Sequence, residues 1–154
     1  MKPSAVAHDT FVIERTYDIP IAQVFRAWAD PTLKARWFAG TAEALGAGYA
    51  LDFQVGGREV NRGGPPGGPV YTYESEFRDI VPEQRIVYTY EMYADDDRIS
   101  VSVATVEFRS RETTTQLVLT EQGVFLDGHD TAAQREEGTR SLLDSLAAIL
   151  ESSR

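Results

Sequence analysis

The segment DGHDTAAQREEGTRSLLDSLAAILES, residues 127–152, is the only long run in the chain whose apolar residues recur at helical spacing. Asp130 and Thr131 offer side-chain oxygens of the kind that cap the start of a helix. Its second half carries the large apolar residues Leu142, Leu143, Leu146, Ile149 and Leu150. Exposing them to water would cost ~1.5–3 kcal/mol each, so earlier parts of the chain must cover this helix.

Composition limits what kind of protein this is. A chain of 154 residues is expected to form one domain over residues 1–154, with residues 1–9 as a flexible tail. The chain has no cysteine, which excludes disulfides and thiolate metal sites. Its only histidines, His8 and His129, lie far apart in sequence, so we expect neither a metal site nor a cofactor.

Charge and hydropathy narrow the choice of partner. The net charge of −9 argues against nucleic acid as a partner. No apolar run approaches the ~20 residues that span a bilayer, so we expect no membrane insertion. We therefore expect a soluble, cytoplasmic protein whose partner is a small hydrophobic or aromatic molecule. A homodimer is compatible with the sequence.

Before the last helix, the pattern alternates between strand and helix signals. A strand is predicted over residues 11–18, then one helix that starts at Pro20 and is broken at Asp30-Pro31, and a second helix over residues 32–37. Residues 49–55 and 58–62 read as a hairpin that turns at Gly56-Gly57. Residues 63–69, GGPPGGP, form a loop. Four longer strands follow over residues 70–80, 85–93, 99–109 and 113–121.

Short connections between the later strands favour an antiparallel meander. The predicted fold class is therefore α+β, with a curved antiparallel sheet of about six or seven strands wrapped around the long C-terminal helix. The two short helices follow the first strand. The open question is whether sheet and helix pack closely or enclose space for a ligand.

Several phrases, in this order, resemble the START-like (SRPBCC) superfamily with its helix-grip fold, and within it the activator of heat-shock protein 90 ATPase homologue-like family. They are YDIP (17–20), VFRAW (24–28), DP (30–31), RWF (36–38), DFQVGG (52–57), RIVYT (85–89), TVEF (105–108), LVLTE (117–121), and Gly138 ahead of LLDSL (142–146). The resemblance implies a cavity between the concave sheet and the long helix, used in the superfamily for lipids, polyketides and other apolar ligands.

Two positions depart from the family pattern. The family commonly has tryptophan where this chain has Thr139 and arginine where it has Gln54, and we expect both changes to alter the lining or the mouth of the cavity. No part of the chain resembles the additional chaperone-binding domain of the eukaryotic activator.

Aromatic and apolar residues are the main candidates for the cavity lining. Alternation places many of them on the concave face, although the same residues serve equally well as a packed core. The candidates are Trp28, Trp37, Phe38, Phe53, Tyr73, Phe77, Tyr88, Tyr90, Phe108, Leu119, Gly138 and Leu142. Gly138 stands out because glycine inside a helix costs ~0.5–1 kcal/mol, which predicts close approach of another element or room for a ligand.

Arg26, Asp52 and Glu91 are the polar candidates. A carboxylate in an apolar cavity has its pKa raised by desolvation and becomes a candidate acid or base. An internal ion pair and a solvated surface position are the alternatives.

Three functions follow from these observations. The first is binding of a small hydrophobic or aromatic ligand in the cavity. The second is a cyclase- or hydrolase-like enzyme that acts on an apolar substrate there, with a residue such as Asp52 or Glu91 moving a proton. The third, suggested by the family resemblance alone, is a cofactor of a chaperone ATPase.

Overall fold

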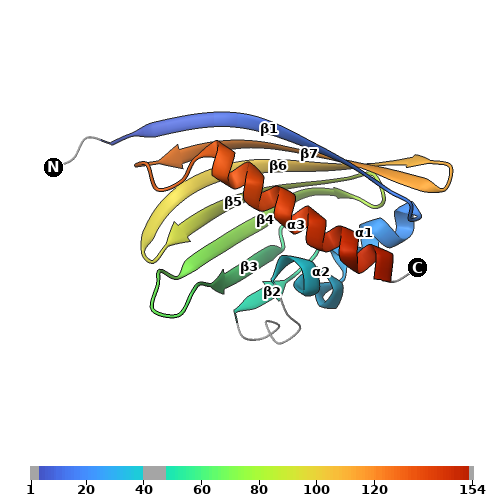
Figure 1. Ribbon diagram of the computed structural model, residues 1–154, viewed down its shortest axis with the longest axis horizontal. Coiled ribbons are helices and arrows are strands. Elements are labelled where there is room, and N and C mark those ends of the chain that lie inside the picture. The colour runs from blue at the N-terminus through green and yellow to red at the C-terminus, as the bar shows by residue number, and fades with distance from the viewer. Residues whose placement is uncertain (1–3, 40–47, 153–154) are drawn as a thin grey trace.

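A computed structural model describes residues 4–39 and 48–152 of the protein, which form a seven-stranded sheet and three helices (Figure 1). The strands are β1 (Val6–Tyr17), β2 (Tyr49–Leu51), β3 (Arg58–Gly63), β4 (Tyr71–Val81), β5 (Arg85–Ala94), β6 (Asp97–Arg111) and β7 (Thr114–Leu126). The helices are α1 (Ile21–Ala29), α2 (Pro31–Phe38) and α3 (Ala132–Ser152). The predicted α+β class, with two short helices after the first strand, is confirmed.

All neighbouring strands pair antiparallel, in the order β1-β7-β6-β5-β4-β3-β2. Strands β2 to β7 form the predicted meander, since each pairs with the next one along the chain. The first strand, β1, joins the far edge beside β7. Figure 1 shows α3 running across the curved sheet, with α1 and α2 near its C-terminal end.

The core lies between the concave face of the sheet and the helices. Residues that alternate along β4 to β7 point into it, as the period of two predicts. From α3, the side chains of Leu143, Leu146 and Leu150 are buried against this face. The interpretation of residues 142–150 as the part of the helix that anchors it in the core is confirmed.

The described N-terminal residues differ from the prediction. Strand β1 begins at Val6, so residues 6–9 belong to the sheet and not to a flexible tail. They pair with the end of β7, from Val6 opposite Leu126 to Asp9 opposite Gly123. Alternation alone missed this because these residues are exposed on both faces, and pairing with β7 is what orders them. Residues 1–3 of the predicted tail lie outside the described residues.

Three further element ends were predicted wrongly. Strand β7 continues to Leu126, and α3 starts at Ala132 and not at Asp127. The cap predicted at Thr131 is confirmed, because its hydroxyl accepts from the Gln134 N–H at 3.1 Å. Strand β2 ends at Leu51, because residues 52–57 form a tight turn. A Cβ at Gly57 would lie 2.2 Å from the Asp52 carbonyl oxygen, so the turn requires glycine there.

No helix within the described parts of the chain is both long enough and apolar enough to cross a membrane.

Candidate functional site

A cavity of about 280 Å³ lies between the sheet and the first half of α3. That volume is near the lower end of the range for small-molecule sites, which is roughly 300–1,000 Å³. Its walls come from all three helices and from β3, β4, β5 and β7. They are Trp28, Trp37, Phe38, Asn61, Tyr73, Tyr88, Tyr90, Met92, Leu119, Glu121, Asp130, Gln134, Arg135, Gly138, Thr139, Leu142 and Leu143.

Six aromatic side chains make up much of the wall, and their rings support one another. The Trp28 and Trp37 rings lie 4.8 Å apart at 67°, and the Phe38 and Tyr73 rings lie 5.0 Å apart at 66°. The Tyr73 and Tyr90 rings lie 4.8 Å apart at 38°. The first two contacts are edge-to-face, an arrangement that is favourable and fixes ring orientation, so this side of the cavity is preorganised.

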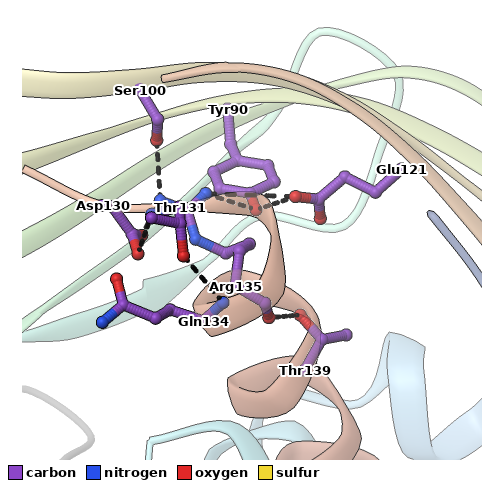
Figure 2. A network of polar contacts seen from close by, with 8 residues as sticks. All are labelled: Tyr90, Ser100, Glu121, Asp130, Thr131, Gln134, Arg135 and Thr139. Carbon is purple, nitrogen blue, oxygen red and sulfur yellow. Dashed lines mark hydrogen bonds and ion pairs between the residues drawn. The ribbon is translucent and has the colours of Figure 1, made fainter. Parts of the chain in front are cut away.

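A polar cluster around Arg135, which reaches from α3 to the sheet, also lines the cavity (Figure 2). Its Nη1 donates to the Tyr90 hydroxyl at 2.9 Å, and the Tyr90 hydroxyl donates to Glu121 Oε2 at 2.7 Å. Its Nη2 donates to Ser100 Oγ at 2.9 Å and to Asp130 Oδ2 at 2.8 Å. The cluster therefore ties β5, β6 and β7 to the start of α3.

The electrostatics of this cluster centre on Glu121, which is 2% exposed. Burial raises its pKa, while the hydrogen bond from Tyr90 and the charge of Arg135 offset part of that effect. Burial also raises the pKa of Tyr90, with the Glu121 charge adding to it, so Tyr90 stays a neutral hydrogen-bond donor. A carboxylate whose proton affinity is raised thus faces an aromatic cavity.

A second buried cluster stands behind the aromatic wall. Lys34, 3% exposed, forms an ion pair with Glu59, 1% exposed, at 3.0 Å, and the Tyr49 hydroxyl donates to Glu59 at 2.6 Å. Burial lowers the pKa of Lys34, and the Glu59 charge works against that shift. The ammonium also lies 5.1, 5.2 and 4.5 Å from the ring centroids of Trp28, Trp37 and Phe38. The pair holds α2, and with it the aromatic wall, against β2 and β3.

The structure brings nine of the twelve predicted lining residues together at the cavity: Trp28, Trp37, Phe38, Tyr73, Tyr88, Tyr90, Leu119, Gly138 and Leu142. The other three, Phe53, Phe77 and Phe108, pack elsewhere in the core. Phe53 contacts Phe77 with ring centroids 5.1 Å apart, and Phe25 contacts Phe108 at 5.3 Å. Phe77 and Phe108 pack behind the lining residues Tyr88 and Trp28, with ring centroids 6.2 Å apart in each case, so the core interpretation holds for these three.

None of the three polar candidates lies at the cavity. Arg26 is exposed on α1, and Asp52 is exposed in the turn after β2. Glu91 alternates with Tyr90 and so points from the opposite face of β5, where it forms an ion pair with Arg98 at 3.0 Å. The surface interpretation is correct for all three, because charged side chains are solvated at lower cost on the outer faces.

Sequence reasoning missed Glu121 and Arg135, although signals for both were present. Glu121 follows Leu117 and Leu119 at a spacing of two, so alternation places it on their face. Arg135 precedes Gly138 by one helical turn. Lys34 likewise precedes Trp37 and Phe38 at helical spacing, but its partner Glu59 lies in a strand with polar residues on both faces.

The two positions that depart from the family pattern differ in their location relative to the cavity. Thr139 lines the cavity, and its hydroxyl donates to the Arg135 carbonyl at 2.9 Å. Gln54 is exposed in the turn after β2 and donates to Asp52 at 3.0 Å. Only Thr139 therefore affects the shape of the cavity.

A curved antiparallel sheet that grips a long C-terminal helix, with a cavity between them, defines the START-like class of proteins. The family model described as "Activator of Hsp90 ATPase homolog 1-like protein" matches residues 18–151, and the chain belongs to this family. The resemblance found in the sequence is confirmed. No curated protein sequence is significantly similar to the chain.

Solved structures include two with high similarity. A protein of Rhizobium leguminosarum is 44% identical, covering 98% of this chain and 99% of its own, with a TM-score of 0.92. The Mll3558 protein of Rhizobium loti is 46% identical over 95% of this chain and 99% of its own, with a TM-score of 0.88. DynU16, a protein in the dynemicin biosynthetic locus, shares the fold at 17% identity, over 95% of this chain and 48% of its own, with a TM-score of 0.69.

Proposed function

We propose that the protein binds one small hydrophobic or aromatic molecule in the cavity between the sheet and α3. The observation that carries this proposal is the cavity itself, about 280 Å³ with six aromatic side chains in its wall. Concave, largely apolar sites with a few polar groups are the usual form of small-molecule sites. Membership of a family within the START-like superfamily supports the same function.

Gly138 offers a way to test where a ligand binds. It lines the cavity, and a Cβ built on it meets nothing within 4 Å. Gly138→Leu therefore places a large side chain beside the cavity, and its Cβ has open space around it. Ala148→Leu, on the exposed surface of α3, adds similar bulk away from the cavity and is the matched control.

The experiment is a thermal-shift screen of fatty acids, flavonoids and aromatic polyketides, followed by calorimetry on the hits. A ligand at 100 times its Kd is expected to stabilise the folded protein by about 2.7 kcal/mol. Gly138→Leu should lose binding, whereas Ala148→Leu should keep it. The proposal fails if no compound stabilises the wild type, or if Gly138→Leu binds hits as tightly as the wild type does.

Acid–base catalysis on an apolar substrate is a second candidate, and it rests on Glu121. Asp52 and Glu91 do not reach the cavity, but Glu121 lines it and has a raised pKa. A carboxylate with these properties suits proton transfer to or from a bound substrate. The test is product formation from any ligand found in the screen. Conversion that persists undiminished in Glu121→Gln would remove Glu121 from this role.

The third function, a cofactor of a chaperone ATPase, stays a prediction from the family description. It predicts that the purified protein stimulates the ATPase of its host's heat-shock protein 90. Absence of both binding and stimulation would exclude it.

A further inference from the structure

The charges at the polar end of the cavity restrict what kind of molecule fits. Among the described residues that line the cavity, Arg135 is the only cation, whereas Glu121 and Asp130 are both carboxylates. Arg135 already makes an ion pair with Asp130 at 2.8 Å and lies 3.9 Å from Glu121. A carboxylate on a ligand would be the third carboxylate facing one guanidinium in a largely desolvated space, which is unfavourable.

The hydrogen bonds already made at this end of the cavity also disfavour a carboxylate on the ligand. Both protons of Arg135 Nη2 are used by Ser100 and Asp130, and the Tyr90 hydroxyl accepts from Arg135 while donating to Glu121. A carboxylate offers about four lone-pair positions. On Glu121, Tyr90 occupies one of them, and a hydrogen bond from the Ser102 side chain also lowers the Glu121 pKa. Glu121 therefore keeps acceptor positions that a hydrogen-bond donor on a ligand can use.

The remainder of the cavity favours a flat, apolar body. Trp28, Trp37, Phe38 and Tyr73 present supported rings on one side, and Leu119 and Leu142 present aliphatic surface. The volume of about 280 Å³ suits a molecule of a few rings.

We infer that the ligand is an uncharged aromatic molecule whose hydrogen-bond donor, such as a phenolic hydroxyl, is held by the Glu121 carboxylate. This inference rests on the proposed function, because it names the class of molecule that binds in the same cavity. It excludes fatty acids and aromatic carboxylates as the preferred ligands.

Four probes share one ring system and differ in their polar group: naphthalene, 2-methoxynaphthalene, 2-naphthol and 2-naphthoate. They separate the effects on binding of the apolar rings, a hydrogen-bond acceptor, a hydrogen-bond donor and a negative charge. Binding is measured by isothermal titration calorimetry on the full chain. A hydrogen bond to a charged group is expected to make 2-naphthol bind about tenfold or more tightly than naphthalene or 2-methoxynaphthalene. The anion 2-naphthoate should bind most weakly of the four.

Three variants test which residues cause the preference for 2-naphthol and the weak binding of 2-naphthoate. Glu121→Gln keeps the shape of the side chain but removes its charge, so the preference for 2-naphthol over 2-methoxynaphthalene should shrink by about tenfold. Asp130→Asn should improve 2-naphthoate binding while leaving the preference for 2-naphthol in place. Glu91→Gln makes the same chemical change outside the cavity and should alter neither. Thermal unfolding of each variant checks that it is folded, and Asp130→Asn keeps the charge argument testable if Glu121→Gln does not fold.

The outcomes separate this inference from the proposed function. Equal binding of naphthalene, 2-methoxynaphthalene and 2-naphthol overturns the inference and leaves the proposed function standing. Tightest binding of 2-naphthoate, or an unchanged preference in Glu121→Gln, overturns it as well. If none of the four probes binds, the inference is wrong, and the broader thermal-shift screen decides separately whether the cavity binds any ligand.

Discussion

Glu121 links the cavity to the pH dependence of stability. Burial raises its pKa above the ordinary value of 4.5, so its ionised form is less favourable in the folded protein than in the unfolded one. This group contributes no penalty below its unfolded pKa. The penalty grows as pH rises from that value through the folded-state pKa, and it is fully present above both.

We therefore predict a pH-dependent effect of Glu121→Gln. The variant's unfolding free energy minus that of the wild type should become more positive as pH rises from about 4 to neutrality, by about 1.4 kcal/mol for each unit of pKa shift. Urea denaturation at a series of pH values measures this difference. Glu91→Gln, at an ion pair on the opposite face, serves as the comparison. A difference that is flat with pH, or that falls, contradicts the assignment.

Lys34 and Glu59 test the second cluster. Lys34→Met leaves a carboxylate buried without its cation and should lower the unfolding free energy by ~3–5 kcal/mol. Adding Glu59→Gln removes that charge while keeping an acceptor for the Tyr49 hydroxyl, so the double variant should recover much of the loss. Urea denaturation of the single and double variants gives the coupling energy. Strictly additive losses would show that the ion pair is not what makes the single variant unstable.

At the scale of elements, α3 contains a glycine that its structure does not require. A Cβ at Gly138 meets nothing within 4 Å, so of the two reasons predicted from the sequence, close approach of another element is wrong. Room beside a ligand, the other reason, stays a prediction. The helix therefore accepts a less stable residue at the cavity.

Gly138→Ala should raise the unfolding free energy by ~0.5–1 kcal/mol, because alanine loses less backbone entropy in a helix. Gly128→Ala is the matched control. A Cβ there also meets nothing within 4 Å, but φ is +72°, where an L-residue is strained, so this variant should be destabilised. Thermal and urea unfolding measure both. If Gly138→Ala is destabilised as well, the side of α3 near the cavity is closed to even a methyl group.

The elements were predictable wherever one local signal dominated. Alternation located β4, β5 and β6 with ends within two residues, and Asp30-Pro31 separated the two short helices as expected. Prediction failed where pairing decides the structure. Residues 6–9 are strand because β7 extends beside them, and residues 52–55 alternate like a strand but leave it because the chain turns at Gly57.

At the scale of the whole molecule, the polar site is the part that sequence reasoning did not find. Tyr90, Ser100, Glu121 and Arg135 belong to β5, β6, β7 and α3, and no local pattern brings four separate elements to one point. The aromatic wall was easier to predict from the sequence, because alternation along a single strand is enough to show which residues share a face. Of the nine candidates that line the cavity, four lie on strands and five lie on helices.

The topology also predicts a folding rate. β1 pairs with β7 from near the other end of the chain, and the sheet has five further antiparallel pairings. Long-range pairings slow folding, so we expect refolding in milliseconds to seconds and not in microseconds. Stopped-flow dilution from urea, followed by the fluorescence of Trp28 and Trp37 in the core, measures it. A main phase of microseconds would contradict the dominance of long-range contacts.

The position of α3 after the strands in the chain has a consequence during protein synthesis. Every strand and both short helices leave the ribosome before the helix that covers the concave face. Until α3 is made, the rings of Trp37, Tyr73 and Tyr88 lie on an uncovered surface. A nascent chain stalled before Ala132 should therefore be recognised by chaperones that bind exposed aromatic surface, and one released after Ser152 should not.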